Sequence, residues 1–423
     1  MNRARVAVLC LCALMMTGCL PLPDGLDDSG ATLPELILGG NAPRPPAADR
    51  YVENEPNDTY EQAEPVTIAE SLELRGTMAA GDVRDLDLFD LGPAQPGDEL
   101  TAELSIAANS DIILGVIDDH QRVIGYIDPA NFTTGPKTLD IVIREPTQVL
   151  LVAVTTRSTS SVERPYTATL RMYRNIGIPD YRPQVVVLNF EGAQGVSISR
   201  RPPVNIPPFD AARIDARYAG QTETIINNIY QMVLQDYAGL GVAIYLSSDP
   251  NIPEGPRSTV YFGTYDSRLL GLADSIDPYN ASLEQSAILY TDTFSVFMPL
   301  APDVIAISQA LANTTSHEIG HLLGLRHTSD TRDIMDTTAS ARQMMMDQWF
   351  RVSPLNPSVI QIGYQDSPGM LAWTLGGVAP GAPSAKALAA RQKAIDLASG
   401  GFDFYIPRDQ LMSCGCETCH LDE

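Results

Sequence analysis

The pattern of apolar and polar positions divides the chain into two kinds of segment. Between residues 51 and 175, short stretches alternate between apolar and polar residues and are separated by Gly, Pro, Asp and Asn. A period of two is typical of strands with one buried face, and regular turn signals between such strands indicate a sandwich or jelly-roll-like fold. Strands are predicted at 100–106, 112–117, 139–143, 149–154 and 166–172.

From about residue 180 the pattern changes. Residues 184–190 form a continuous apolar run, which indicates a strand buried on both faces. Residues 222–237 carry apolar residues at helical spacing, and a second helix is expected at about 304–323. Further strands are predicted at 242–246, 259–262 and 286–290, an irregular stretch at 271–280, and helices at 339–350 and 386–397. The predicted fold class is therefore an all-β sandwich or jelly-roll-like domain followed by an α/β (α+β) domain.

The candidate chemistry lies at the end of the 304–323 helix. His317 and His321 are four residues apart, so on a helix they project from one face and can bind one metal ion. Glu318 can hold a water molecule beside that metal, and Gly324 allows a left-handed turn that returns His327 as a third ligand. Three protein ligands with one open position are typical of a catalytic zinc site. The alternative is an amphipathic helix whose histidines have this spacing by accident.

Met335 follows His327 by eight residues, in the short polar turn Asp333-Ile334-Met335-Asp336. Together these motifs resemble the metzincin clan of zinc endopeptidases, with H-E-x-x-H-x-x-G-x-x-H and a Met-turn. The eight-residue spacing between His327 and Met335 favours the matrixin-like members of the clan. The resemblance implies a zincin-like domain with a twisted sheet, a backing helix and an active-site helix. A strand near 286–290, or its neighbour, would then border the cleft and pair with an extended substrate.

The resemblance also implies roles for individual residues. Zinc bound by the three histidines would activate a water molecule, with Glu318 as general base and then general acid. Met335 would form a hydrophobic floor without ligating the metal. Two positions depart from the better-known families. Thr328 follows the third histidine, and Thr337 stands where some families carry a tyrosine ligand.

The first alternating segment begins with 53–59, E-N-E-P-N-D-T, followed by 82–89, D-V-R-D-L-D-L-F. It is similar to the bacterial pre-peptidase C-terminal domain, several members of which bind calcium through the opening stretch. Calcium prefers an all-oxygen shell. On an extended strand, the side chains of Glu53, Glu55 and Asn57 would point to one side. The alternative is that these acids coat an exposed surface. The candidate calcium ligands are Glu53, Glu55, Asn57, Asp58, Asp82 and Asp85.

The N-terminus carries two arginines and an apolar core before the small residues that precede Cys19, which indicates a secretory signal. Residues 16–19, M-T-G-C, resemble a bacterial lipobox, which implies lipidation of Cys19 after removal of 1–18. Leu20 then favours the outer membrane or cell surface; the alternative is a plain secretory signal and a secreted protein. The Pro-rich segment 19–50 would be a spacer.

The net charge of −24 argues against nucleic acid as a partner, because a phosphate-binding surface needs clustered Lys and Arg. Cys414, Cys416 and Cys419 lie in the tail, where C-x-x-C-H formally matches a haem attachment pattern. A disulfide with a spare thiol, or a minor metal site, is favoured over haem because only three residues follow His420. The predicted domains are thus 51–175 and 180–411, followed by a Cys-rich tail at 412–423.

Two functions follow from the sequence. The favoured one is a surface-anchored zinc endopeptidase that hydrolyses protein or peptide substrates. The alternative is a non-catalytic zinc- or calcium-binding lipoprotein with a binding or structural role. Glu318 favours the first, because it is needed for catalysis and not for metal binding.

Overall fold

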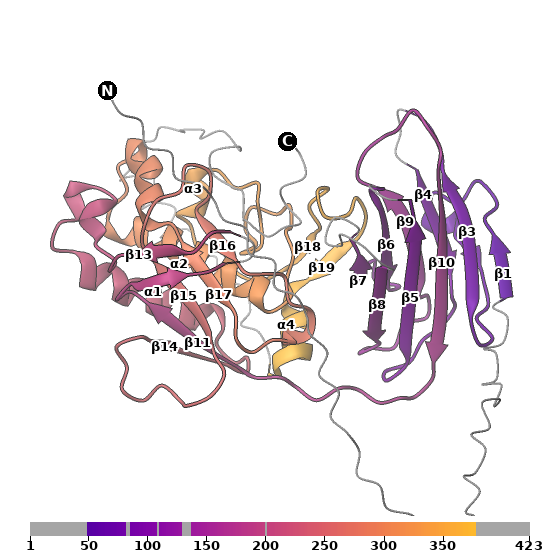
Figure 1. Cartoon of the computed structure of the whole chain (residues 1–423), viewed down its shortest axis with the longest axis horizontal. Helices are drawn as coiled ribbons and strands as arrows, with labels where there is room; N and C mark the ends of the chain where they lie inside the picture. Colours follow the sequence, from indigo (N-terminus) through magenta and orange to yellow (C-terminus); the bar gives the residue numbers. More distant parts are fainter. Residues whose placement is uncertain (1–48, 82–84, 108–109, 129–136, 199–200, 378–423) are drawn as a thin grey trace, which may run out of the picture. The chain divides into compact units, whose positions relative to one another are not determined.

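The chain folds first into a β sandwich and then into an α/β region, which confirms the predicted fold class (Figure 1). This computed structural model describes residues 49–81, 85–107, 110–128, 137–198 and 201–377. The described residues belong to one compact unit that begins at Ala47. The helix expected at 386–397, the Cys-rich tail and Cys19 lie outside the described residues.

The sandwich consists of two five-stranded sheets. One sheet has the order β1-β3-β10-β5-β8 and the other β2-β4-β9-β6-β7. Their strands are β1 Asp49–Val52, β2 Glu64–Pro65, β3 Leu72–Met78, β4 Leu86–Asp90, β5 Glu99–Ile106, β6 Ile112–Ile117, β7 Val123–Ile127, β8 Lys137–Val142, β9 Leu151–Thr156 and β10 Arg164–Tyr173. The five predicted strands are confirmed within two residues at each end, and the other strands were not recognised from the sequence.

Two strands of the sandwich are buried on both faces rather than on one. Every residue of β6 and β9 is buried. One face of these strands packs into the core between the sheets, while Ile113 and Leu151 on the other face pack with Leu355 and Ile360. The predicted alternation is therefore incomplete in this sheet, because a later part of the chain covers the face that would otherwise meet water.

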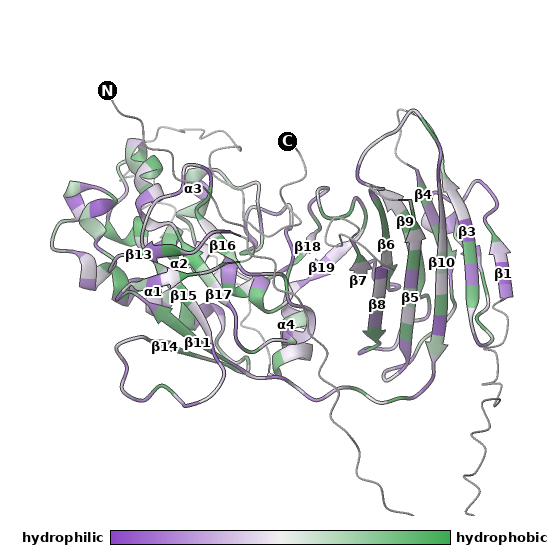
Figure 2. Cartoon of the chain, viewed as in Figure 1, coloured by the Kyte–Doolittle hydropathy of each residue, from purple (hydrophilic) through white to green (hydrophobic). Residues whose placement is uncertain are grey.

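The α/β region is built on a sheet with the order β14-β11-β15-β17-β16. Its strands are β11 Gln184–Asn189, β14 Val242–Leu246, β15 Ser258–Phe262, β16 Gly271–Ala273 and β17 Ser286–Leu289. Four of these pair in parallel, and β16 pairs antiparallel with β17 at the edge. Apolar residues, green in Figure 2, dominate β11 and β14. The stretch expected to be irregular thus contains the edge strand, and β17 lies inside the sheet.

Two helices pack together in this region. α1 Thr222–Asp236 and α2 Val304–Leu322 match the predicted helices closely. The carboxylate of Asp236 accepts a hydrogen bond from the Ser316 hydroxyl at 2.6 Å, and the Tyr237 hydroxyl donates to the Ser316 carbonyl at 2.8 Å. From Ala306 onward every residue of α2 is buried, so the metal-binding end of this helix has no exposed face of its own.

The remaining elements are short. They are the hairpin strands β12 Ala193–Val196 and β13 Val204–Ile206, the strands β18 Val352–Pro354 and β19 Tyr364–Asp366, the helices α3 Ala341–Met344 and α4 Ser367–Leu375, and the 3₁₀ segments η1 Tyr60–Gln62, η3 Ala211–Arg213, η4 Ala216–Tyr218, η5 Pro278–Asn280 and η6 Thr291–Leu300. No helix among the described residues combines the length and apolar character needed to cross a bilayer.

The helix expected over 339–350 is wrong beyond its first turn. α3 is only four residues long. The side-chain amide of Asn313 donates hydrogen bonds to the carbonyl oxygens of Met344, at 2.8 Å, and Met346, at 2.6 Å. A continuing helix would use these carbonyls in its own backbone bonds. Hydrogen bonds from a buried side chain of α2 therefore take the place of the helical backbone bonds, and the predicted helix ends after α3.

Candidate metal centre

The sequence around α2 sets where the helix starts and stops. The carboxylate of Asp303 accepts a hydrogen bond from the Ala306 amide at 2.8 Å and caps the first turn. At the other end Gly324 has a φ of 93°, as expected from its position in the motif. The amides of Gly324 and Leu325 donate to the carbonyls of His321 and Gly320, both at 2.9 Å, which closes a Schellman turn.

This turn brings the third histidine back to the other two. The Nε2 atom of His321 lies 3.1 Å from Nε2 of His317 and 3.1 Å from Nε2 of His327. Tetrahedral zinc with bonds of about 2.0–2.1 Å places ligand nitrogens about 3.3 Å apart. All three side chains are buried, and His317 is the most exposed at 8%. The structure therefore brings together the three histidines that the sequence predicts as ligands.

The far ring nitrogens fix the orientation of two of these rings. Nδ1 of His317 lies 2.7 Å from the carbonyl oxygen of Ile334, and Nδ1 of His321 lies 2.8 Å from that of Leu325. A carbonyl oxygen only accepts, so each Nδ1 donates, and in a neutral ring Nε2 then presents a lone pair. Lone pairs that face each other at 3.1 Å are stabilised by a cation between them. Three imidazole donors in this arrangement fit zinc.

Glu318 lies against the edge strand of the sheet. It is buried, with 1% of its surface exposed. A Cβ atom on Gly271 in β16 would approach Oε1 of Glu318 to 2.2 Å, so the carboxylate uses the space left by a missing side chain. The position of Glu318 therefore depends on a glycine that the sequence reasoning did not single out.

Met335 lies under the helix that carries the histidines. A Cβ atom on Gly320 would approach the Met335 sulfur to 2.5 Å, and Met335 is fully buried. The Met335 amide donates to the Asp333 carboxylate at 3.1 Å, and the Thr328 hydroxyl donates to the same carboxylate at 3.0 Å. Asp333 thus links the Met-turn to the residue that follows His327. Burial raises the pKa of Asp333 to about 7.

Backbone contacts on both sides of His327 hold its loop in place. The Asn356 amide donates to the His327 carbonyl, and the Thr328 amide donates to the Met335 carbonyl, both at 2.9 Å. The side chain of Gln365 accepts from the Arg326 amide and donates to the Arg326 carbonyl, both at 2.8 Å. Gln365 is 39 residues from Arg326, so no local sequence signal pointed to it.

Thr337 has a structural partner, since its hydroxyl accepts a hydrogen bond from the side-chain amide of Asn356 at 2.8 Å. Tyr290, which follows β17, lies near Glu318. The pKa of Tyr290 is raised to about 12, mainly by burial, and the charge of Glu318 contributes to the rise. Tyr290 follows the apolar run of β17, and this run carries no sequence signal that would assign Tyr290 to the metal centre.

The candidate calcium ligands lie at the start of the sandwich. β1 ends at Val52, so Glu53, Glu55 and Asn57 are not arranged by strand alternation. Glu55 and Asp85 lie close to Asp87, with one oxygen from each within 4.8 Å of the others. Burial raises the pKa of Glu55, and the nearby charges of Asp85, Asp58 and Glu53 add to the rise. The predicted Asp82 lies outside the described residues.

Two residues of the acidic motifs 53–59 and 82–89 are fully buried. Asn57 and Asp87 are both 0% exposed. Neither polar atom of the Asn57 side-chain amide has a hydrogen-bond partner among the described residues, and neither has Oδ1 of Asp87. Burial also raises the pKa of Asp87 well above its ordinary value. Asp87 was not among the predicted ligands, although it alternates with Asp85 in the same sequence motif.

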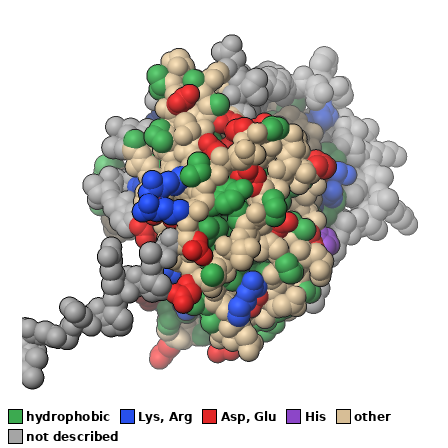
Figure 3. Space-filling model, turned by 90° about the vertical axis from the view of Figure 1, so that its right-hand side faces the viewer, with side chains coloured by type: hydrophobic (Ala, Val, Ile, Leu, Met, Phe, Trp, Pro, Cys, Tyr) green, Lys and Arg blue, Asp and Glu red, His purple; other side chains and the backbone are tan. Residues whose placement is uncertain are grey.

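On the face that Figure 3 draws, acidic side chains (red) occur at several places among neutral and apolar ones, and basic side chains (blue) are present as well.

Comparison with known proteins finds similarity to a peptidase family. The Matrixin family model (peptidase M10) matches residues 285–356, a segment that contains the three histidines, Glu318 and Met335. No match is found among curated proteins.

Three solved structures illustrate the structural similarities. Archaemetzincin from Methanopyrus kandleri is 14% identical, with 40% of this chain and 88% of that chain covered and a TM-score of 0.24. The pre-peptidase C-terminal domain of Bacillus anthracis collagenase is 10% identical, with 29% and 100% covered and a TM-score of 0.20. The Aeromonas hydrophila periplasmic lysozyme inhibitor PliG is 16% identical, with 30% and 100% covered and a TM-score of 0.21. At these TM-scores the similarities carry no argument about function.

Proposed function

We propose that this protein is a zinc-dependent endopeptidase that hydrolyses peptide bonds of extracellular proteins. The observation that carries the proposal is the convergence of three histidine Nε2 atoms beside Glu318, within the segment that matches the Matrixin model. His317, His321 and His327 would hold the metal. When bound, zinc would supply Lewis acidity that lowers the pKa of water and polarises a carbonyl group.

The chain's own residues would divide the remaining work. Glu318 would take a proton from the attacking water and return it to the leaving amine. The carbonyls of Ile334 and Leu325 keep the His317 and His321 rings oriented. Met335 packs under Gly320 and supports the helix from below. The edge strand β16, next to Glu318, is the place for an extended peptide to pair, although its three residues are buried in this structure.

Zinc removal tests the proposal. The purified chain is assayed for casein cleavage after dialysis against a chelator, and again after one equivalent of zinc per chain is restored. We expect cleavage to disappear and then return. If zinc binds at one per chain and no protein substrate is cleaved under any condition, the non-catalytic alternative replaces the peptidase.

We also propose the domain division and location expected from the sequence. These are a sandwich domain over 51–175, a catalytic domain over 180–411, and lipidation at Cys19 with anchoring at the outer membrane or cell surface. The support is the lipobox-like M-T-G-C sequence at 16–19 and the Pro-rich segment that follows it. Metabolic labelling with a palmitate analogue tests it: Cys19→Ala should lose the label, whereas Cys10→Ala should keep it.

A second proposal concerns calcium in the opening stretch of the sandwich. It is supported by the close approach of Glu55, Asp85 and Asp87 and by the buried amide of Asn57. No comparison with known proteins adds support. Calcium should raise the melting temperature of the wild-type chain and have no effect on Asp87→Asn. An equal shift in both proteins would refute the site.

A further inference from the structure

A cavity of about 270 Å³ lies between the sandwich and the α/β region, away from the histidines. Strands β7 and β8 form one wall, and the segment 276–279, the end of α2 and helix α4 form the other. Much of the lining is apolar, with Ile141, Leu323, Met370 and Trp373 among its residues. A largely apolar cavity with a few polar groups is typical of a small-molecule site, and this volume is near the lower end for one.

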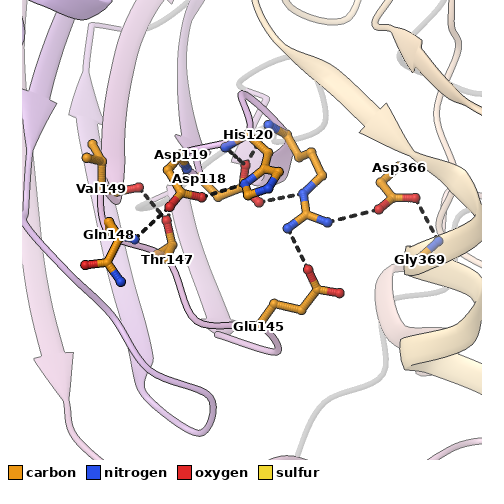
Figure 4. A network of polar contacts seen from close by, with 10 residues as sticks. Asp118, Asp119, His120, Glu145, Thr147, Gln148, Val149, Asp366 and Gly369 are labelled. Atoms are coloured by element: carbon orange, nitrogen blue, oxygen red, sulfur yellow. Dashed lines mark hydrogen bonds and ion pairs between the residues drawn. The ribbon is translucent and has the colours of Figure 1, made fainter.

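The acidic groups of the lining already have basic partners. Arg122 bonds to Asp118 at 2.6 Å, to Glu145 at 2.7 Å and to Asp366 of the α/β region at 3.1 Å. Figure 4 shows these carboxylates converging on that one guanidinium. Asp128 pairs with Arg157. Among the described residues, none of these acids forms an ion pair with the two other arginines of the lining, Arg326 and Arg144.

Arg326 is a further cation of the lining. Its guanidinium carbon lies 4.0 Å from the centroid of the Tyr126 ring, and the residue is 9% exposed. Its Nε is buried without a hydrogen-bond partner, and no ion pair joins it to an acid among the described residues. Arginine keeps its charge in proteins, and stacking on a ring offsets only part of the cost of burying it. An anion in the cavity would complete the pairing.

Arg144 adds a second cation of the same kind. Its guanidinium lies over the Tyr279 ring at 5.9 Å, and its Nε is buried without a partner. Its only hydrogen bond to a described residue goes to the carbonyl of Pro179, at 3.2 Å. Burial raises the pKa of Tyr279, and the charges of both Arg144 and Arg326 oppose the rise, so both guanidiniums act on this phenol. The two arginines therefore both lie near Tyr279, in the same part of the cavity.

We propose that this cavity binds a small carboxylate with an apolar body. The carboxylate would lie at Arg326 and Arg144, whose planar guanidiniums match its two oxygens. The body would pack on Trp373, Met370 and Ile141. A monoanion suits the site better than a phosphate dianion, because the lining already holds the carboxylates of Asp118, Asp128 and Glu145.

Two residues of the cavity lining, Leu323 and Arg326, lie in the segment that carries the histidines, so a bound ligand would act on the metal centre through this segment. Arg326 directly precedes His327, and Leu323 lies in the turn between His321 and His327. The Asp277 amide, two residues before Tyr279, donates to the His321 carbonyl at 3.1 Å. A Cβ atom on Gly324 would approach the Asp277 carbonyl to 2.9 Å. Binding in the cavity would therefore stiffen the loop that carries the third histidine.

Calorimetric titration of the zinc-loaded full chain with 3-phenylpropanoate and its neutral amide tests the proposal. We expect a dissociation constant on the order of millimolar or tighter for the acid. The amide should bind about tenfold more weakly or worse, and Arg326→Gln should weaken acid binding by a similar factor. Arg171→Gln, at an exposed position of β10 outside the cavity, is the matched control and should bind as the wild type does.

Melting temperatures establish that each variant is folded, and Arg144→Gln replaces Arg326→Gln if the latter does not fold. Acetyl-phenylalanine in place of 3-phenylpropanoate separates a peptide C-terminus from a free small acid as the source; tighter binding of either supports the site. The proposal is overturned if none of these acids binds, if the amide binds as well as the acid, or if both arginine variants bind like the wild type. Binding itself is the readout, so this result is independent of whether the chain cleaves peptides.

Discussion

A Cβ atom on Gly271 would lie 2.2 Å from Oε1 of Glu318. The same atom would lie 2.7 Å from the carboxyl carbon and 2.8 Å from Cγ of Glu318. The edge strand of the sheet and the metal-binding helix therefore meet at the residue proposed as general base. The absence of a side chain at position 271 allows this contact.

Gly271→Ala tests this relationship. The added methyl group should push the Glu318 carboxylate aside, which costs little stability because the end of a flexible side chain can move. A displacement of about 1 Å near the reacting atoms can reduce the rate about a hundredfold. We expect casein cleavage to fall by about that factor, with zinc content and melting temperature close to wild type.

Gly369→Ala is a matched control for that substitution, because its Cβ would also approach the end of an acidic side chain, Asp366 at 2.6 Å. It lies at the start of α4 and does not contact Glu318. Full activity in Gly271→Ala would show that the close approach does not position the general base.

His321→Ala should remove the metal. Its Nε2 atom lies 3.1 Å from both other candidate ligand nitrogens, so its loss leaves only two of the three histidine donors. Metal analysis should give about one zinc per wild-type chain and far less in the variant. A chelator should lower the melting temperature of the wild type, because it removes a metal that stabilises the folded chain. It should leave the melting temperature of the variant unchanged, because the variant has no bound metal to lose.

His120→Ala is the control for His321→Ala, because this histidine is exposed on the sandwich. It should retain both the zinc and the chelator-dependent shift. Equal zinc content in His321→Ala and the wild type would contradict the assignment of the ligands.

Gln365→Ala should weaken the loop that precedes His327. The substitution removes both hydrogen bonds to the Arg326 backbone, which is buried at this point. Each buried group left without a partner costs about 1–3 kcal/mol, so the loss of both bonds should lower the free energy of urea unfolding by roughly 2–6 kcal/mol. Zinc affinity should fall about tenfold or more, as for other groups that orient metal ligands. Gln148→Ala, at an exposed position, should change neither quantity.

The buried carboxyl of Asp333 makes stability depend on pH. Its pKa is raised by burial from 3.8 to about 7 in the folded chain. A raised folded pKa contributes stability that is fully present below pH 3.8 and is lost as the pH rises toward 7. In zinc-free protein, the unfolding free energy of the wild type should therefore fall between about pH 4 and about pH 7 relative to Asp333→Asn. The fall approaches about 1.4 kcal/mol per pH unit within that interval.

Asp330→Asn provides a control of opposite sign for that titration. At Asp330 burial would raise the pKa, but the hydrogen bonds and charge of Arg332, together with the charge of Arg351, lower it overall. This carboxylate therefore contributes stability above its unfolded pKa of 3.8 that is lost as the pH falls. Urea unfolding at several pH values measures both variants, and parallel curves for wild type and Asp333→Asn would contradict the account of Asp333.

Local periodicity predicted the elements whose burial follows their own sequence. β14 and α1 were predicted almost to the residue, α1 from apolar residues at helical spacing and β14 from a continuous apolar run. The expectation that the 242–246 strand is buried is wrong for most of its residues, because β14 lies at an edge of the sheet. β3 carried an equally clear alternation of buried and exposed residues over Leu72–Met78 and could have been recognised. The three-residue β16 gave too short a pattern, and its role comes from pairing with β17.

Contacts between distant residues account for what the sequence did not predict. The histidines were predictable because their spacing within eleven residues fixes their geometry. Gln365 and Gly271 were not, because each reaches the centre from a remote segment of the chain. Asn313 ended a predicted helix through bonds across 31 and 33 residues. The cavity beside Arg326 likewise needs both the sandwich and the α/β region.

Glu318→Gln gives the most direct test of the central claim. The substitution keeps the size of the side chain and leaves the three histidines in place, but it removes the proton acceptor. We expect wild type and variant to bind equal amounts of zinc and to melt at similar temperatures, with casein cleavage reduced about 10²–10⁴-fold in the variant. Undiminished cleavage by a zinc-loaded Glu318→Gln chain would contradict the proposed mechanism at its centre.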